Sequence, residues 1–120
     1  MTAAAAPTDI RSDRAERRLE IAFDDGSTIS LPAELLRVES PSAAVQGHHP
    51  AQKRIVAGKR QVAISAIESV GNYAIRIRFS DGHDTGIYTW AWLHRMGRDQ
   101  AQVWSAYVAA LAAAGLTRDG

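Results

Sequence analysis

Residues 67–90 read IESVGNYAIRIRFSDGHDTGIYTW and carry the clearest strand and turn pattern of the chain. Ile75, Ile77 and Phe79 alternate with two arginines, which is the period of a strand with one buried face. A Gly-Asn pair precedes this strand and a Ser-Asp-Gly-His turn follows it. The stretch therefore predicts an antiparallel meander that continues into the segment TGIYTW.

Upstream of this meander, a second hairpin is predicted. Leu19, Ile21 and Phe23 alternate with Glu20 and Ala22, and Asp25-Gly26 turns the chain into the strand STISL. Pro32 then suits the first turn of a short helix. Residues 39–60 hold prolines, glycines and paired histidines and predict a long loop, with strand patterning resuming at residues 61–64.

Two helices are predicted after the meander. The first has Thr89 as N-cap and Gly97 as its stop. The second spans residues 99–114, with Asp99 and Gln102 spaced as in a capping box and Gly115 at its end. Its stripe of Trp104, Tyr107, Val108 and Leu111 is expected to pack across the apolar face of the sheet. The predicted fold class is α+β, with antiparallel β-hairpins and a meander packed against C-terminal helices.

Composition narrows the class of protein. The 120 residues suit one domain, and we expect a disordered tail over residues 1–17 and a folded domain over residues 18–117. The absence of cysteine excludes disulfides, thiolate nucleophiles and cysteine-based metal sites. No apolar run is long enough to span a bilayer, and the start does not resemble a secretory signal, so a cytoplasmic location is expected.

No complete catalytic motif is present, so the chain is expected not to be an enzyme. None of the four histidines is followed two residues later by a carboxylate, which argues against the iron site of non-haem oxygenases. Neither a G-x-S-x-G sequence nor a phosphate-binding loop occurs. One alternative is a zinc or iron site in which His83 combines with Asp84, His48 and His49; the simpler interpretation is that these histidines are solvated or cap a turn.

Nucleic-acid binding is a second alternative. Lys53-Arg54 and Lys59-Arg60 form a short basic segment, and Arg76 and Arg78 project from one strand face. Arginines with a period of two are, however, typical of a solvent-facing strand surface paired with carboxylates, and the net charge is only +1. We therefore expect neither a nucleic acid nor a membrane as partner.

Three segments resemble a known family: LRVESPSA at residues 36–43, the meander with its continuation at residues 67–93, and the final spacing Trp104, Tyr107, Leu111, Gly115. From about Leu19 to Leu116 the chain is similar to the gamma-butyrobetaine hydroxylase-like N-terminal domain. The resemblance implies a zinc held by three cysteines and one histidine. The histidine position matches His83, whereas the cysteine positions fall near Ser40, Ser42 and Val45, so no cofactor is expected.

The resemblance also implies a role. The family occurs as stand-alone small bacterial proteins and fused to P-loop iron–sulfur carriers of the ApbC/Mrp type, and this chain resembles the stand-alone kind. We therefore expect a non-catalytic module that binds another protein, such as an iron–sulfur carrier or assembly factor, in cluster assembly or iron metabolism. The expected partner-binding surface surrounds the third hairpin and consists of Asn72, Tyr73, Arg76, Arg78, His83, Tyr88 and Trp90.

Overall fold

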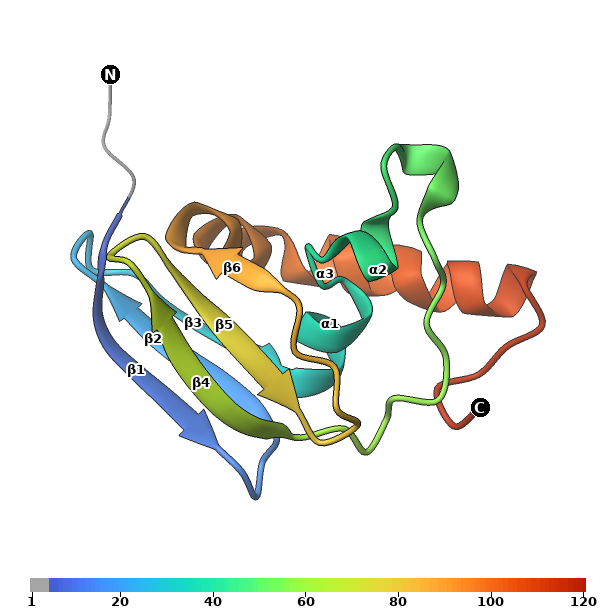
Figure 1. The fold of residues 1–120 in the computed structure, drawn as a ribbon, viewed down its shortest axis with the longest axis horizontal. Helices are drawn as coiled ribbons and strands as arrows, with labels where there is room; N and C mark the ends of the chain where they lie inside the picture. Colours follow the sequence, from blue (N-terminus) through green and yellow to red (C-terminus); the bar gives the residue numbers. More distant parts are fainter. Residues whose placement is uncertain (1–4) are drawn as a thin grey trace.

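Two three-stranded antiparallel sheets and a long C-terminal helix make up the fold in a computed structural model that describes residues 5–120 (Figure 1). The elements are β1 (Pro7–Asp13), β2 (Arg18–Phe23), β3 (Thr28–Pro32), α1 (Ala33–Val38), α2 (Ala43–Gln46), the 3-10 helix η1 (Pro50–Gln52), β4 (Ile64–Val70), β5 (Ala74–Phe79), β6 (Ile87–Thr89) and α3 (Trp90–Ala113). One sheet has the order β1-β2-β3 and the other β4-β5-β6. The predicted α+β class is confirmed.

The first sheet contains a strand, β1, that was not predicted from the sequence. The hairpin at Asp25-Gly26 forms as predicted, but β1 also pairs antiparallel with β2. The prediction of a disordered tail over residues 1–17 is therefore wrong for β1, while residues 1–4 lie outside the described residues. Ile10 is the only Ile, Leu, Val or Phe of β1, so the strand has almost no apolar pattern of its own and depends on backbone hydrogen bonds to β2.

The second sheet is the predicted meander. Gly71, at φ +53°, lies in the turn between β4 and β5, and β6 pairs with β5 from Ile87 to Thr89. Strand β4 begins at Ile64, later than the predicted start at residues 61–64, although Val62 is already buried. The apolar faces of the two sheets pack against each other, so the core lies between them.

A single helix, α3, replaces the two helices predicted for residues 89–114. Thr89 caps it as predicted, with its hydroxyl accepting from the Trp92 N–H at 3.1 Å. Gly97 does not stop the helix, because it lies against β3: an added Cβ would be 2.3 Å from Ile29 Cγ2. Asp99 is in the middle of the helix and pairs with Arg98 at 3.1 Å, so no capping box forms.

The second half of α3 runs past the sheets (Figure 1). Trp104 packs against the main core as predicted. Tyr107 and Leu111 instead pack with Val38 of α1 and with residues 56–57 of the long loop, and Val108 is exposed, so the predicted packing across the sheet is wrong for the rest of the stripe. The helix ends as predicted, with Gly115 at φ +70°.

The folded unit also extends beyond its predicted end at residue 117. Arg118 donates two hydrogen bonds to Glu34 of α1, and the Arg118 carbonyl accepts from the Arg60 N–H at 3.1 Å. The C-terminal segment therefore joins α1 to the long loop.

Candidate functional site

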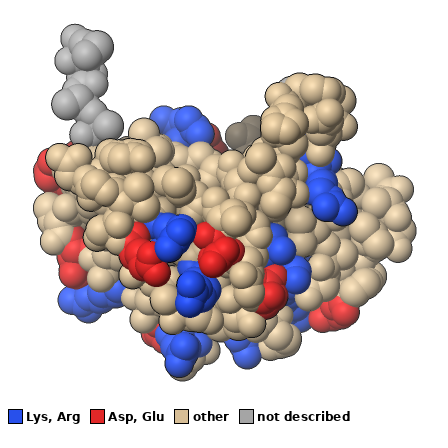
Figure 2. Space-filling view, viewed as in Figure 1, with Lys and Arg blue, Asp and Glu red and all other residues tan. Residues whose placement is uncertain are grey.

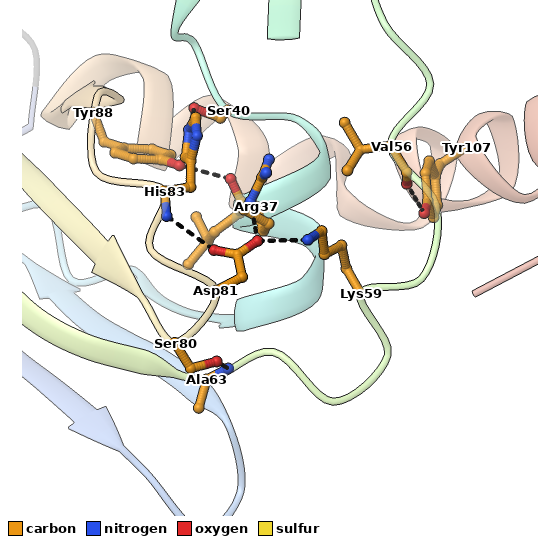
Figure 3. A network of polar contacts seen from close by, with 11 residues as sticks. Arg37, Ser40, Val56, Lys59, Ala63, Ser80, Asp81, His83, Tyr88 and Tyr107 are labelled. Atoms are coloured by element: carbon orange, nitrogen blue, oxygen red, sulfur yellow. Dashed lines mark hydrogen bonds and ion pairs between the residues drawn. The ribbon is translucent and has the colours of Figure 1, made fainter. Parts of the chain in front are cut away.

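His83 lies where the turn between β5 and β6 crosses the segment that follows α1 (Figure 3). Its Nε2 is 3.1 Å from the Ser40 hydroxyl, and Ser42 Oγ is 2.6 Å from Thr85 Oγ1 in the same turn. Ser40 is fully buried and Ser42 nearly so. Two hydroxyl contacts therefore fasten this turn to residues that are more than forty positions away in the sequence.

Asp81 is the charged centre of this turn. Its Oδ2 accepts from Arg37 Nε at 2.7 Å and lies 2.7 Å from Lys59 Nζ, while Oδ1 accepts from the His83 N–H at 3.0 Å (Figure 3). Burial by itself would raise the pKa of Asp81, but the hydrogen bonds from Lys59, the His83 N–H and Arg37 outweigh it and lower that pKa. Asp81 therefore stays ionised and joins α1, the long loop and the hairpin turn.

Tyr88 lies on the core side of the polar cluster that Arg37, Ser40, Lys59, Asp81 and His83 form (Figure 3). It is fully buried, and its hydroxyl donates to the Leu36 carbonyl at 2.7 Å. Burial raises the pKa of the Tyr88 phenol, which keeps it neutral. Gly86 is needed here, because an added Cβ would lie 2.6 Å from Ser40 Oγ. The expectation that Tyr88 binds a partner is therefore wrong. The alternating pattern of a strand does not show whether a tyrosine ring faces the solvent or the core.

The pair of Ser40 and His83 does not form an accessible nucleophile. Burial, and then the charge of Arg37, lower the pKa of His83, so its ring is neutral at pH 7. A neutral imidazole can accept the Ser40 proton, but Ser40 has no exposed surface at which to meet a substrate. The geometry supports a structural hydrogen bond between these two side chains.

We expect the folded state to lose stability on acidification because of His83. Its folded pKa lies below the ordinary value of 6.5. The stability due to neutral His83 is therefore complete above about pH 6.5 and declines as the pH falls through the folded pKa, because the unfolded chain binds the proton more readily. Urea unfolding of wild type and His83→Gln across this window checks it: the variant should show the shallower pH dependence, and equal slopes would contradict the assignment.

The metal site implied by the family does not fit the residues present. The structure does bring Ser40 to His83, but serine hydroxyls and Val45 stand at the positions of the three thiolates. The alternative donors are not gathered either: His48 and His49 are exposed, and Asp84 lies 3.7 Å from Arg78. Within residues 5–120 no three His, Asp or Glu side chains are placed to hold a metal ion.

The remaining predicted partner-binding residues lie on or beside the outer face of β4–β6. Tyr73 is 53% exposed, and Ile87 beside Arg76 is 44% exposed. Trp90 is half-buried, and its Nε1 donates to the Asn72 carbonyl at 2.9 Å. Sequence reasoning missed Ile87 as a surface residue, because an apolar residue in a strand is more often assigned to the core.

Charges on this face are paired. Arg76 is 2.6 Å from Glu68, and Arg78 is 3.7 Å from Asp84. Figure 2 shows acidic and basic side chains interspersed over the visible face rather than a continuous basic surface. Lys53, Lys59 and Arg60 of the long loop also pair with carboxylates, at 2.7–2.8 Å. This pattern does not favour the nucleic-acid alternative.

The cluster itself was only partly foreseen. His83 and the positions of Ser40 and Ser42 followed from the family resemblance. Arg37, Lys59 and Asp81 were missed as members of one cluster, because they come from three segments and only the tertiary fold brings them together. The one local signal was Asp81 in a turn, which fits many hairpins.

Fold and cluster together define a small α+β domain in which the turn between β5 and β6 is bound to the end of α1. The gamma-butyrobetaine hydroxylase-like N-terminal family matches residues 10–94, and the chain belongs to this family.

Three solved structures are similar to the chain. Two are solution NMR structures: one is 39% identical, covers 98% of this chain and 92% of its own, and has a TM-score of 0.84; the other is 44% identical, covers 98% and 90%, and has a TM-score of 0.83. The third is a crystal structure of a DUF971-family protein of unknown function from Acidithiobacillus ferrooxidans ATCC 23270, 41% identical, covering 76% of this chain and 91% of its own, with a TM-score of 0.64. No curated protein matches the sequence. In the described part of the chain, no helix has the length and apolar character needed to cross a membrane.

Proposed function

We propose that this domain is a non-catalytic protein-binding module that serves iron–sulfur cluster assembly, with an iron–sulfur carrier or assembly factor as its partner. The link to cluster assembly comes from the architectures in which the family resemblance places such domains, fused to P-loop carriers of the ApbC/Mrp type. The binding role is supported by exposed side chains on β5 and β6 and in the turn between β4 and β5. We call this surface, made of Tyr73 in the turn and Arg76, Arg78 and Ile87 on the strands, the outer sheet face.

The observation that carries this proposal is the exposure of Tyr73 and Ile87 beside paired charges. Tyr73 is 53% exposed to solvent and Ile87 is 44% exposed. Tyrosine supplies a large, rigid contact area, and arginine supplies hydrogen-bond donors; both residue types are enriched among interface residues that contribute most to binding. Arg76 lies directly opposite Ile87 in the strand register, so an apolar and a charged anchor stand side by side.

The polar cluster supports a binding role rather than a catalytic one. Its hydroxyls and imidazole are engaged with each other, and Ser40 and Tyr88 have no exposed surface. We assign the cluster the task of holding the β5–β6 turn, and hence the adjoining outer sheet face, in a fixed shape. A rigid interface loses less conformational entropy on binding.

Direct binding to purified P-loop iron–sulfur carriers from the same host tests the proposal. We expect calorimetry to show saturable binding and a Tyr73→Ser/Ile87→Ser variant to bind at least about tenfold more weakly, as for loss of two interface anchors. Val108→Ser is the matched control, because Val108 is 42% exposed but lies on α3. Absence of carrier binding would contradict the iron–sulfur role; equal binding by wild type and the double variant would contradict the assigned surface.

A further inference from the structure

We propose that the groove between the long loop and α3 binds a medium-chain carboxylate, with the apolar chain against the helix and the carboxylate on Arg54. This loop–helix groove has a volume of about 280 Å³, and Val38, Arg54, Ile55, Ala106, Tyr107 and Ala110 line it. Val38 and Glu39 of its lining lie between Arg37 and Ser40 in the chain, but no residue of the outer sheet face or of the polar cluster lines the groove itself. The inference does not rest on the function proposed above.

The floor and one wall of the groove are apolar. Val38 and Tyr107 are nearly fully buried beneath it, and Ala106 and Ala110 of α3 leave room because their side chains end at Cβ. Ile55 stands at the edge and is 43% exposed. An apolar cavity of about 150 Å³ is enough to hold a benzene molecule. The loop–helix groove therefore has space for a short alkyl chain, which would also cover Ile55.

The charge at the groove is positive. Lys53 is paired with Glu39 at 2.8 Å, so these two lining residues neutralise each other. Burial raises the pKa of Tyr107 to about 12, so its phenol is uncharged at pH 7. Arg54 makes no ion pair with a carboxylate among residues 5–120. A guanidinium beside an apolar groove favours a ligand with a carboxylate at one end.

Hydrogen bonds hold the loop backbone around Arg54 in place before any ligand arrives. The Arg54 N–H donates to the Val45 carbonyl at 2.7 Å, and the Tyr107 hydroxyl donates to the Val56 carbonyl on the other side of Ile55. The loop segment is therefore attached at both sides to the rest of the domain, to α2 and to α3. Preorganisation of this kind reduces the entropic cost of ligand binding.

Calorimetry and NMR with octanoate test this site, with octanol and octylammonium as ligands that share the chain but lack the carboxylate. We expect octanoate to bind saturably and to shift the resonances of Ile55, Ala106 and Tyr107. Arg54→Ala should weaken binding at least about tenfold, as for loss of one charge-assisted hydrogen bond. Ala106→Phe, which fills the groove, should abolish it.

Two considerations about the variants make the octanoate-binding test decisive. Arg60→Ala removes another cation of the long loop that does not line the groove, and it should leave octanoate binding unchanged. Arg54→Ala removes only an exposed side chain, so its backbone hydrogen bond and fold should persist. No saturable binding of octanoate, octanol binding as tightly as octanoate, or undiminished binding by Arg54→Ala would each overturn the proposal.

Discussion

Replacing Arg118 with alanine will lower the free energy of unfolding by about 3 kcal/mol, the low end of the cost of breaking a buried ion pair. The Glu34 side chain is only 6% exposed, and it accepts from Arg118 Nη2 at 2.7 Å and Nε at 2.9 Å. The change leaves this carboxylate buried without its cation. We place the cost at the low end because the Arg118 side chain is itself 33% exposed and partly screened by water.

Chemical denaturation measures this loss, and Arg60→Ala is the control in the same region. Arg60 pairs with Asp119 at 2.7 Å, but both side chains are largely exposed, so its removal should cost less than about 1 kcal/mol. Because Arg118 also lies 5.0 Å from the centroid of the Trp104 ring, its loss should change the tryptophan fluorescence of the folded state. An equal loss of unfolding free energy in the two variants would show that the ion pair with Arg118 does not stabilise the buried Glu34 carboxylate.

Gly97→Ala is expected to destabilise the fold by about 2 kcal/mol, although alanine is the better helix former by about 1 kcal/mol. The new Cβ would lie 2.3 Å from Ile29 Cγ2 and 2.7 Å from Ile29 Cβ, so either α3 must move away from β3 or Ile29 must shift. Both responses open the core, because Ile29 is buried. Thermal and urea unfolding measure the effect.

A double-mutant cycle with Ile29→Ala separates this clash from any other cause. Ile29→Ala removes the Cγ2 atom at 2.3 Å and keeps only the Cβ at 2.7 Å, so it relieves the larger part of the clash. The double variant should therefore cost at least about 1 kcal/mol less than the sum of the two single changes. Strict additivity would contradict the close contact between helix and strand. A Gly97→Ala variant more stable than wild type would show that helix propensity decides at this position.

The elements with strong local patterns were predictable. The strand with Ile75, Ile77 and Phe79, the three predicted turns with glycine at positive φ, and the Thr89 cap all appear as expected, because each depends on residues near in sequence. The predictions that proved wrong also share a cause, which is that tertiary contacts override local preference. Gly97 looked like a stop because an isolated helix would lose stability there, whereas in the fold the missing side chain lets α3 contact Ile29.

The α+β class, the meander and, through the motif around His83, the family all follow from local patterns in the sequence. These depend on periodicity and turn chemistry, which act over a few residues. The packing of the folded chain was needed to show that β1 joins a sheet, that Tyr88 is a core residue rather than a surface residue, and that Arg37 and Lys59 meet at Asp81. The contacts of Tyr88, Arg37 and Lys59 join residues more than twenty positions apart and are set by how the two sheets and α3 pack. Strand β1 pairs with the neighbouring β2 but has almost no apolar pattern of its own, so local sequence does not record it either.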